Sequence, residues 1–251
     1  MKIDFHVHSS ASHDGTASYC HIAQAAAKAG LDAVFVCDHN YVGLTKPVFM
    51  EGVWLLPGCE VSSKGAHVLG LFIDERLDMS GFNRENLPSV EEAIEKIHNA
   101  GGLAVIAHPF ANPESQQFDK DKLGILPDGI EAANSRAWMM NPDANAQALE
   151  YAKEIGVFTT GGSDAHLKEE IGNSYAVIEG NLTGKTESEV DAAVRTALLS
   201  KKSEAVCRTN TKRIYKGFSQ LERRNRSGRT SQKLVGVAYL CKCWMLDLLK
   251  K

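Results

Sequence analysis

Residue types that bind metal ions recur at six places along this chain of 251 residues. Each place lies next to a short apolar run of the kind that forms a buried strand. In a parallel strand–helix protein, the carboxyl ends of the strands open onto one face. We therefore expect these side chains to converge on one site. The candidates are Asp4, His6, His8, Asp38, His39, Glu60, His67, His108, Asp164 and His166.

The pair His6 and His8 is the clearest of these features. Residues two apart on a strand point to the same side, so both imidazoles can hold one ion. Imidazoles combined with carboxylates suit zinc, manganese or iron. Two histidines packed in a core are the alternative, and the later Asp-His and Asp-Ala-His segments argue against it.

The candidates from the middle of the chain suggest different roles. A carboxylate at Glu60 can bridge two cations, although a surface glutamate is the alternative. His67 opens a strand, where a core or rim histidine is also common, and His108 ends one. Asp38 suits an acceptor that orients an imidazole, or else a helix cap. Asp4 lies nearer the buried start of its strand, so we expect it behind the ligands.

The segment Gly161-Gly162-Ser163-Asp164-Ala165-His166 is the strongest after the first. Its two glycines let the backbone approach a ligand closely. Asp164 and His166 can then serve one ion or two. In the earlier loop, either His13 or Asp14 can reach back to the site, and we favour Asp14 because Gly15 follows it.

Composition indicates an ordinary globular protein, with 43% hydrophobic and 24% charged residues. The net charge of −3 gives no general attraction to nucleic acid or anionic membranes. No apolar run approaches the roughly 20 residues that span a bilayer. A strand is expected almost at the first residue, so we expect no signal peptide, and the six cysteines show no zinc-knuckle spacing. We expect a cytoplasmic protein.

Strand and helix signals alternate, which predicts an α/β fold with a parallel sheet, most simply a closed barrel. Glycines such as Gly30 and Gly156 are expected to end helices. Helices are predicted at 21–30, 89–100, 143–155 and 186–199, and strands at 2–5, 33–37, 53–57, 67–73, 103–107, 129–133, 157–160 and 175–178.

The last part of the chain differs from the rest. Between Lys212 and Lys233 there are eight lysines or arginines and a single acid, Glu222. Residues 235–249 are apolar and predicted to be helical. We therefore expect two units, a domain over 1–205 that carries the candidate metal site and a basic, then apolar, helical extension over 206–251. The basic segment either steers a nucleic acid or solvates a docked helix.

The ordered motifs resemble the PHP family, the polymerase and histidinol phosphatase domain. The resemblance implies a distorted seven-stranded β/α barrel with two or three divalent metal ions at its carboxyl end. It implies metal ligands at His6, His8, Asp14, His39, Glu60, His67, His108, Asp164 and His166. In the most similar branch, the segment Asn134-Ser135-Arg136 lies over the substrate phosphate, which implies that these three residues bind substrate. The motifs are Asp4–Ser9, Ser12–Gly15, Cys37–Asn40, Gly58–Ser62, His67–Gly70, Ala107–Pro109, Gly129–Arg136 and Gly161–His166.

We therefore expect a hydrolase in which a metal-activated hydroxide attacks a phosphate ester. Asp164, His166 and Arg136 are the expected catalytic residues, with either a second ion or a protonated His166 assisting the leaving group. The expected substrate is a nucleotide, another small phosphorylated compound or a short nucleic acid, and no membrane partner is expected. A histidinol-phosphate phosphatase, an amidohydrolase-like enzyme and a non-catalytic metal-binding or nucleic-acid-binding module are the alternatives. Amidohydrolases usually need a lysine at a strand end, which this sequence lacks.

Overall fold

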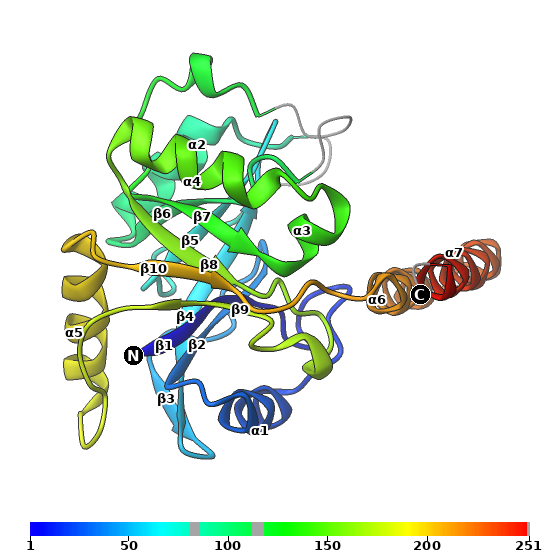
Figure 1. Ribbon diagram of the computed structural model, residues 1–251, viewed down its shortest axis with the longest axis horizontal. Helices are drawn as coiled ribbons and strands as arrows, with labels where there is room; N and C mark the ends of the chain where they lie inside the picture. Colours follow the sequence, from blue (N-terminus) through cyan, green and yellow to red (C-terminus); the bar gives the residue numbers. More distant parts are fainter. Residues whose placement is uncertain (81–85, 112–117, 250–251) are drawn as a thin grey trace.

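The computed structural model describes residues 1–80, 86–111 and 118–249 (Figure 1). Its strands are β1 (Lys2–Val7), β2 (Ala33–His39), β3 (Val48–Met50), β4 (Val53–Ser62), β5 (His67–Leu71), β6 (Leu103–Ala107), β7 (Gly129–Asn134), β8 (Phe158–Gly162), β9 (Ser174–Val177) and β10 (Glu204–Cys207). Its α-helices are α1 (Tyr19–Ala29), α2 (Val90–Asn99), α3 (Ser135–Met140), α4 (Ala144–Ile155), α5 (Glu187–Leu199), α6 (Arg213–Arg226) and α7 (Thr230–Leu248). Two short 3₁₀ helices are η1 (Lys120–Lys122) and η2 (Lys168–Glu170).

The strands form one curved sheet in the order β10-β9-β1-β2-β4-β5-β6-β7-β8, with β3 paired to β4. The segment after β8 returns to β1, where the amide of His8 donates to the carbonyl of Ala165 at 2.8 Å. Val7 pairs in parallel with the same alanine. The predicted α/β barrel class is thus confirmed, although the sheet has ten strands rather than seven.

The sheet is mixed, so the prediction of a parallel sheet is wrong in part. Strand β5 is antiparallel to both β4 and β6, and β9 is antiparallel to β1 and β10. Only residues 63–66 separate β4 from β5, and a parallel crossover needs a dozen residues or more. An antiparallel strand presents its first residue where its parallel neighbours present their last. His67, the first residue of β5, therefore lies at the same end of the barrel as His39, the last residue of β2.

The barrel interior is filled by apolar side chains and closed at one end by α5. Phe5, Phe35 and Leu69 are fully buried inside, and Val190 and Leu198 of α5 join the same cluster. Figure 1 shows α5 beside the start of β1, with α1, α2 and α4 around the sheet. With one end of the barrel closed by helix packing, the end where β1 and β2 finish is left for polar side chains.

The predicted helix ends are confirmed where the sequence carries cap signals. Ser89 accepts from the amide of Glu92, whose carboxylate accepts from the Ser89 amide in return. Gly30 and Gly156 end α1 and α4 in the left-handed conformation, with φ of 74° and 71°.

Helices α6 and α7 pack against each other at the side of the molecule where β1 ends (Figure 1). The apolar segment is helical as predicted, while a separate helix α6 was not predicted. Much of α7 is exposed, including Leu234 and Trp244. Within the described ranges, none of the helices has both the length and the apolar character required to cross a membrane. The division of the chain into two units stays a prediction.

Candidate metal centre

Nine side chains predicted as ligands lie together at the mouth of the barrel. Each of the nine offers a ring nitrogen or a carboxylate oxygen to at least one group of three ligand atoms. Within each group, the three atoms lie no more than 4.8 Å from one another. They come from β1, the loop after it, β2, β4, β5 and the segments after β6 and β8. They are His6, His8, Asp14, His39, Glu60, His67, His108, Asp164 and His166.

Four of these side chains point their ligand atoms at one location. The Nε2 atoms of His6 and His8 are 3.2 Å apart, and they lie 3.4 Å and 3.3 Å from Oε2 of Glu60. Oδ1 of Asp164 lies 3.8 Å from Nε2 of His6 and 3.4 Å from Nε2 of His8. Tetrahedral ligands at about 2.0–2.1 Å from a zinc ion would be about 3.3 Å apart. The spacing therefore fits one small divalent cation.

The carboxylate of Glu60 joins this location to a second one. Its Oε2 lies 2.9 Å from Nδ1 of His39, and its Oε1 contacts Nδ1 of His67 and lies 3.2 Å from Nε2 of His108. One buried carboxylate thus faces five imidazoles. This geometry is the one expected of a bridging carboxylate between neighbouring cations.

A third group involves the loop after β1. The Asp14 carboxylate lies 3.5 Å from Nε2 of His166 and 3.7 Å from Nε2 of His39. His13 also lies beside it, at 3.7 Å, but 42% of the His13 side chain is exposed against 5% for Asp14. The geometry favours Asp14 over His13 as the ligand.

Unpartnered atoms at the mouth fit metal ions. Among the described residues, Oδ1 of Asp14, Oε2 of Glu60 and Nδ1 of His108 are buried and make no hydrogen bond, although Nδ1 of His39 lies 2.9 Å from the Glu60 oxygen. Buried polar atoms without partners are costly, and the nearest groups are imidazole nitrogens and carboxylates. Divalent cations would satisfy these atoms with the imidazole and carboxylate ligands that zinc, manganese and iron accept.

The electrostatics of the mouth reflect close opposite charges. Burial acts to raise the pKa of the Glu60 carboxyl, but His67, His39 and His6 outweigh it and hold the pKa well below its usual value. Burial acts to lower the pKa of His8, yet Asp164 and Glu60 raise it to about 9. Protons on such histidines would be exchanged for metal ions on binding.

His166 behaves differently. Burial, Arg136 and His8 together lower its pKa, despite the nearby Asp14. Its Nδ1 lies 2.9 Å from the carbonyl of Asp164, which suits an N–H donor and leaves Nε2 with a free lone pair. A neutral imidazole suits a metal ligand better than the protonated acid expected for the leaving group.

Glu131 belongs to the site, although no role was predicted for it. It lies on β7 and is 1% exposed, with Oε1 3.1 Å from Nδ1 of His6. Its Oε2 accepts from the His108 amide at 2.9 Å and from Nδ2 of Asn134 at 2.9 Å. Glu131 therefore orients His6 so that Nε2 faces the cluster. The sequence signal that could have indicated this role is a single acidic residue, Glu131, within an otherwise apolar strand.

Asp4 and Asp38, whose roles were uncertain from the sequence, accept hydrogen bonds from backbone amides. Asp4 accepts from the amides of Ser163, Gly172 and His6, and burial raises its pKa to about 6 despite those bonds. It lies behind the ligands, as predicted. Asp38 accepts from the amide and hydroxyl of Ser9, both at 2.7 Å, so the prediction that it orients an imidazole or caps a helix is wrong.

Close packing of β8 accounts for the two glycines before Asp164. A Cβ at Gly162 would lie 2.4 Å from Cβ of His6 and 2.5 Å from Oε1 of Glu131. A Cβ at Gly161 would lie 2.2 Å from a strand carbonyl. These glycines let protein segments approach one another rather than a ligand. Asp164, with φ of 54°, is a non-glycine residue in the left-handed region, a form of strain found at functional sites.

The segment Asn134-Ser135-Arg136 is buried and occupied by protein contacts. Asn134 caps α3 by accepting from the Ala137 amide, and the Ser135 hydroxyl donates to the carbonyl of Ser163. Arg136 lies in the first turn of α3.

The Arg136 guanidinium binds Glu170 through two nitrogens, at 2.9 Å and 2.7 Å. Its third nitrogen donates to Ser219 of α6. The substrate-binding and catalytic roles of these residues stay predictions, and the geometry favours a positioning role.

Helix α6 also holds the loop that carries Asp14. The Arg226 guanidinium donates to the carbonyls of Ser10, Ser12 and Gly15 at 3.0, 2.7 and 2.9 Å. These bonds make Arg226 part of the wall of the site.

Comparison with known proteins agrees with this geometry. The model of a PHP-associated family matches residues 142–197. An uncharacterized protein of Methanocaldococcus jannaschii is 30% identical over 183 residues, which cover 70% of this chain and 69% of that one. A probable phosphatase of Vibrio campbellii is 27% identical over 213 residues, covering 71% of this chain and 83% of the relative.

A solved two-domain structure from Bacteroides vulgatus contains a predicted PHP-like metal-dependent phosphoesterase. It superposes with a TM-score of 0.57 at 18% identity and covers 82% of this chain. This chain spans 64% of that protein. The fold and the cluster define a β/α barrel with a histidine- and carboxylate-rich centre at its mouth. The chain belongs to the PHP family.

Proposed function

We propose that this protein is a metal-dependent phosphoesterase. The observation that carries the proposal is the convergence of nine ligand side chains, Glu60 at their centre, in which buried oxygens of Glu60 and Asp14 make no hydrogen bond to any residue that the structure describes. A purely structural cluster of charges would have its acceptors satisfied. The probable phosphatase of Vibrio campbellii supports a phosphate ester as the substrate.

Two or three divalent ions held there would supply positive charge for the transferring phosphoryl group and acidify a nucleophilic water. His6, His8 and Asp164 would hold one ion beside Glu60, and His39 and His67 would hold a neighbouring one with the same carboxylate. His108, which groups with His6 and Glu60, would complete either set. Asp14 and His166 would hold a further one.

Residues behind the ligands hold the ligand nitrogens in position by hydrogen bonds. Glu131 fixes the ring of His6, and Ser12 places its hydroxyl 3.3 Å from Nδ1 of His8. The amide of His39 donates to the same Ser12 hydroxyl. Such partners lower the cost of reorganisation during the reaction.

A cation for the substrate phosphate is available on α6. Lys216 is half-buried, and its Nζ lies 2.8 Å from Sδ of Met140. Burial and Arg136 lower the pKa of Lys216, while Asp164 acts to raise it. With Arg136 committed to Glu170, Lys216 is the better phosphate-binding candidate.

We further propose that the substrate is a nucleotide or another small phosphorylated compound. The basic segment supports a short nucleic acid less well, because Arg226 is bound to backbone carbonyls and Arg224 to Gln220. These cations therefore do not all face solvent as a track for a polyanion.

The test is a panel of phosphomonoesters, nucleotides and short RNAs assayed with and without added manganese. We expect manganese-dependent phosphate release that Glu60→Gln abolishes. Glu150→Gln, a change of the same kind on an exposed residue of α4, is the matched control and should behave as wild type. No phosphate release from any compound with any divalent metal would contradict the proposal.

Lys216→Ala tests the finer assignment. It should raise KM about tenfold without loss of metal, about 1.4 kcal/mol of binding. An unchanged KM would remove Lys216 from the substrate site.

A further inference from the structure

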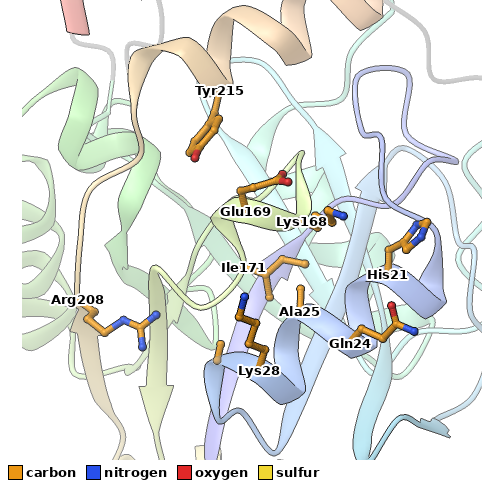
Figure 2. A pocket seen from close by; sticks show the side chains of 10 residues that line it. His21, Gln24, Ala25, Lys28, Lys168, Glu169, Ile171, Arg208 and Tyr215 are labelled. Atoms are coloured by element: carbon orange, nitrogen blue, oxygen red, sulfur yellow. The ribbon is translucent and has the colours of Figure 1, made fainter. Parts of the chain in front are cut away.

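A pocket lies outside the metal centre, between α1, η2 and the segment that leads into α6 (Figure 2). Its volume is about 580 Å³, and none of its lining residues belongs to the metal cluster. Pockets that bind small molecules typically measure roughly 300–1,000 Å³. The pocket is therefore large enough for a ligand the size of a mononucleotide.

The lining of this pocket is rich in cations. Lys28 of α1, Lys168 of η2 and Arg208 extend along it, against a single carboxylate from Glu169. Within the described ranges, none of these three cations forms an ion pair. In a protein whose net charge is −3, three cations with one acid form a local excess of positive charge.

The remaining donors are arranged around the same space. Figure 2 shows Lys28 and Arg208 on one side, with Lys168 and His21 across from Lys28. Tyr215 descends from α6 with its hydroxyl toward the pocket. Ammonium and guanidinium groups beside a phenol are the donors that a phosphate group recruits. Glu169 can accept from hydroxyl or amino groups on the rest of such a ligand.

We propose that this pocket binds a phosphorylated small molecule of mononucleotide size through Lys28 and Arg208. The tyrosine ring and Glu169 face the remainder of the ligand. The pocket is a binding site only, and it does not depend on the reaction at the metal centre.

The experiment is calorimetric titration of the metal-loaded protein with three probes: inorganic phosphate, adenosine, and a phosphonate analogue of AMP that cannot be hydrolysed at an ester bond. Wild type is compared with Lys28→Glu/Arg208→Glu. The matched control is Lys202→Glu/Lys242→Glu, which makes the same change in charge at exposed positions away from the pocket.

We expect wild type and control to bind one more equivalent of the phosphonate than the pocket variant, or to bind it at least tenfold more tightly. Hydrolysis at the metal centre should be equal in all three proteins. Lys28→Ala/Arg208→Ala repeats the comparison if the charge reversal lowers the unfolding temperature. Identical titrations of wild type and both pocket variants would overturn the proposal. Adenosine binding as tightly as the phosphonate would overturn it as well, because the phosphate would then contribute nothing.

Discussion

Charged side chains are buried in two neighbouring regions of this protein, and the two regions balance their charges differently. At the barrel mouth, Glu60 is surrounded by five imidazoles, yet one of its oxygens makes no hydrogen bond within the described part of the chain. Beside α6, the carboxylate of Glu170 accepts from two nitrogens of Arg136, the hydroxyl of Thr211 and the amides of His166 and Leu167. The first region is incomplete as protein alone, and the second is complete.

This difference separates binding from scaffolding. An incomplete set of buried acceptors indicates a ligand that completes it, here divalent cations. A buried carboxylate whose hydrogen bonds are all made by protein groups, such as Glu170, stabilises the fold around the site and cannot accept further bonds from substrate. Changes in the first region should therefore alter activity and metal content, and changes in the second should alter stability.

The largest effect is expected from Asp164→Asn. The amide keeps the shape of the side chain but loses the charge that would hold a cation beside His6 and His8. Turnover should fall about a thousandfold, or about 4 kcal/mol of barrier, with little change in thermal unfolding. Steady-state kinetics and calorimetry of the same sample check this. Turnover above about a tenth of wild type would exclude Asp164 from the ligands.

Arg136→Ala should act mainly on stability. It leaves the buried carboxylate of Glu170 without its charged partner, and such a loss costs about 3 kcal/mol or more. Urea unfolding measures the loss, and metal content at native conditions should stay the same. Arg213→Ala, on the first turn of α6, serves as the comparison. Its guanidinium donates to the carbonyl of Met139 at 3.4 Å and, among the described residues, forms no ion pair with a carboxylate. Unchanged stability together with a raised KM would restore the predicted phosphate-binding role of Arg136.

Arg226→Ala should give the smallest of the three effects, and it sharpens the comparison because Arg226 joins the two regions. Loss of three hydrogen bonds to the carbonyls of residues 10, 12 and 15 should loosen the loop that carries Asp14. We expect about a tenfold loss of turnover, ~1.4 kcal/mol, which higher metal concentration partly restores. Arg229→Ala, at an exposed position just beyond α6, should have no effect. Equal rates for both variants at limiting metal would show that the loop is held without Arg226.

Much of the site could be predicted from the sequence because its ligands lie at strand ends, where apolar runs give way to polar residues. The position of His67 at the mouth depends on the antiparallel direction of β5, and the alternation of strands and helices suggested the opposite direction. Glu131 was missed because its role is to bind His6, a residue 125 positions earlier. Arg136 was assigned to phosphate from the family resemblance, and its partner Glu170 lies on a short 3₁₀ helix that no sequence pattern marked.

The C-terminal region could be predicted only as helical. Its attachment to the site depends on single long side chains, such as Arg226, reaching backbone carbonyls more than 200 residues earlier. A backbone carbonyl is present at every residue, so the sequence carries no sign of which ones an arginine will reach.

Metal counting tests the central claim most directly. Protein purified without chelator is analysed by elemental mass spectrometry, before and after loading with manganese or zinc, beside Glu60→Gln. The incomplete mouth predicts two to three divalent ions per wild-type chain after loading and a loss of at least one of them in the variant. Less than one ion per wild-type chain after loading with either metal would contradict it.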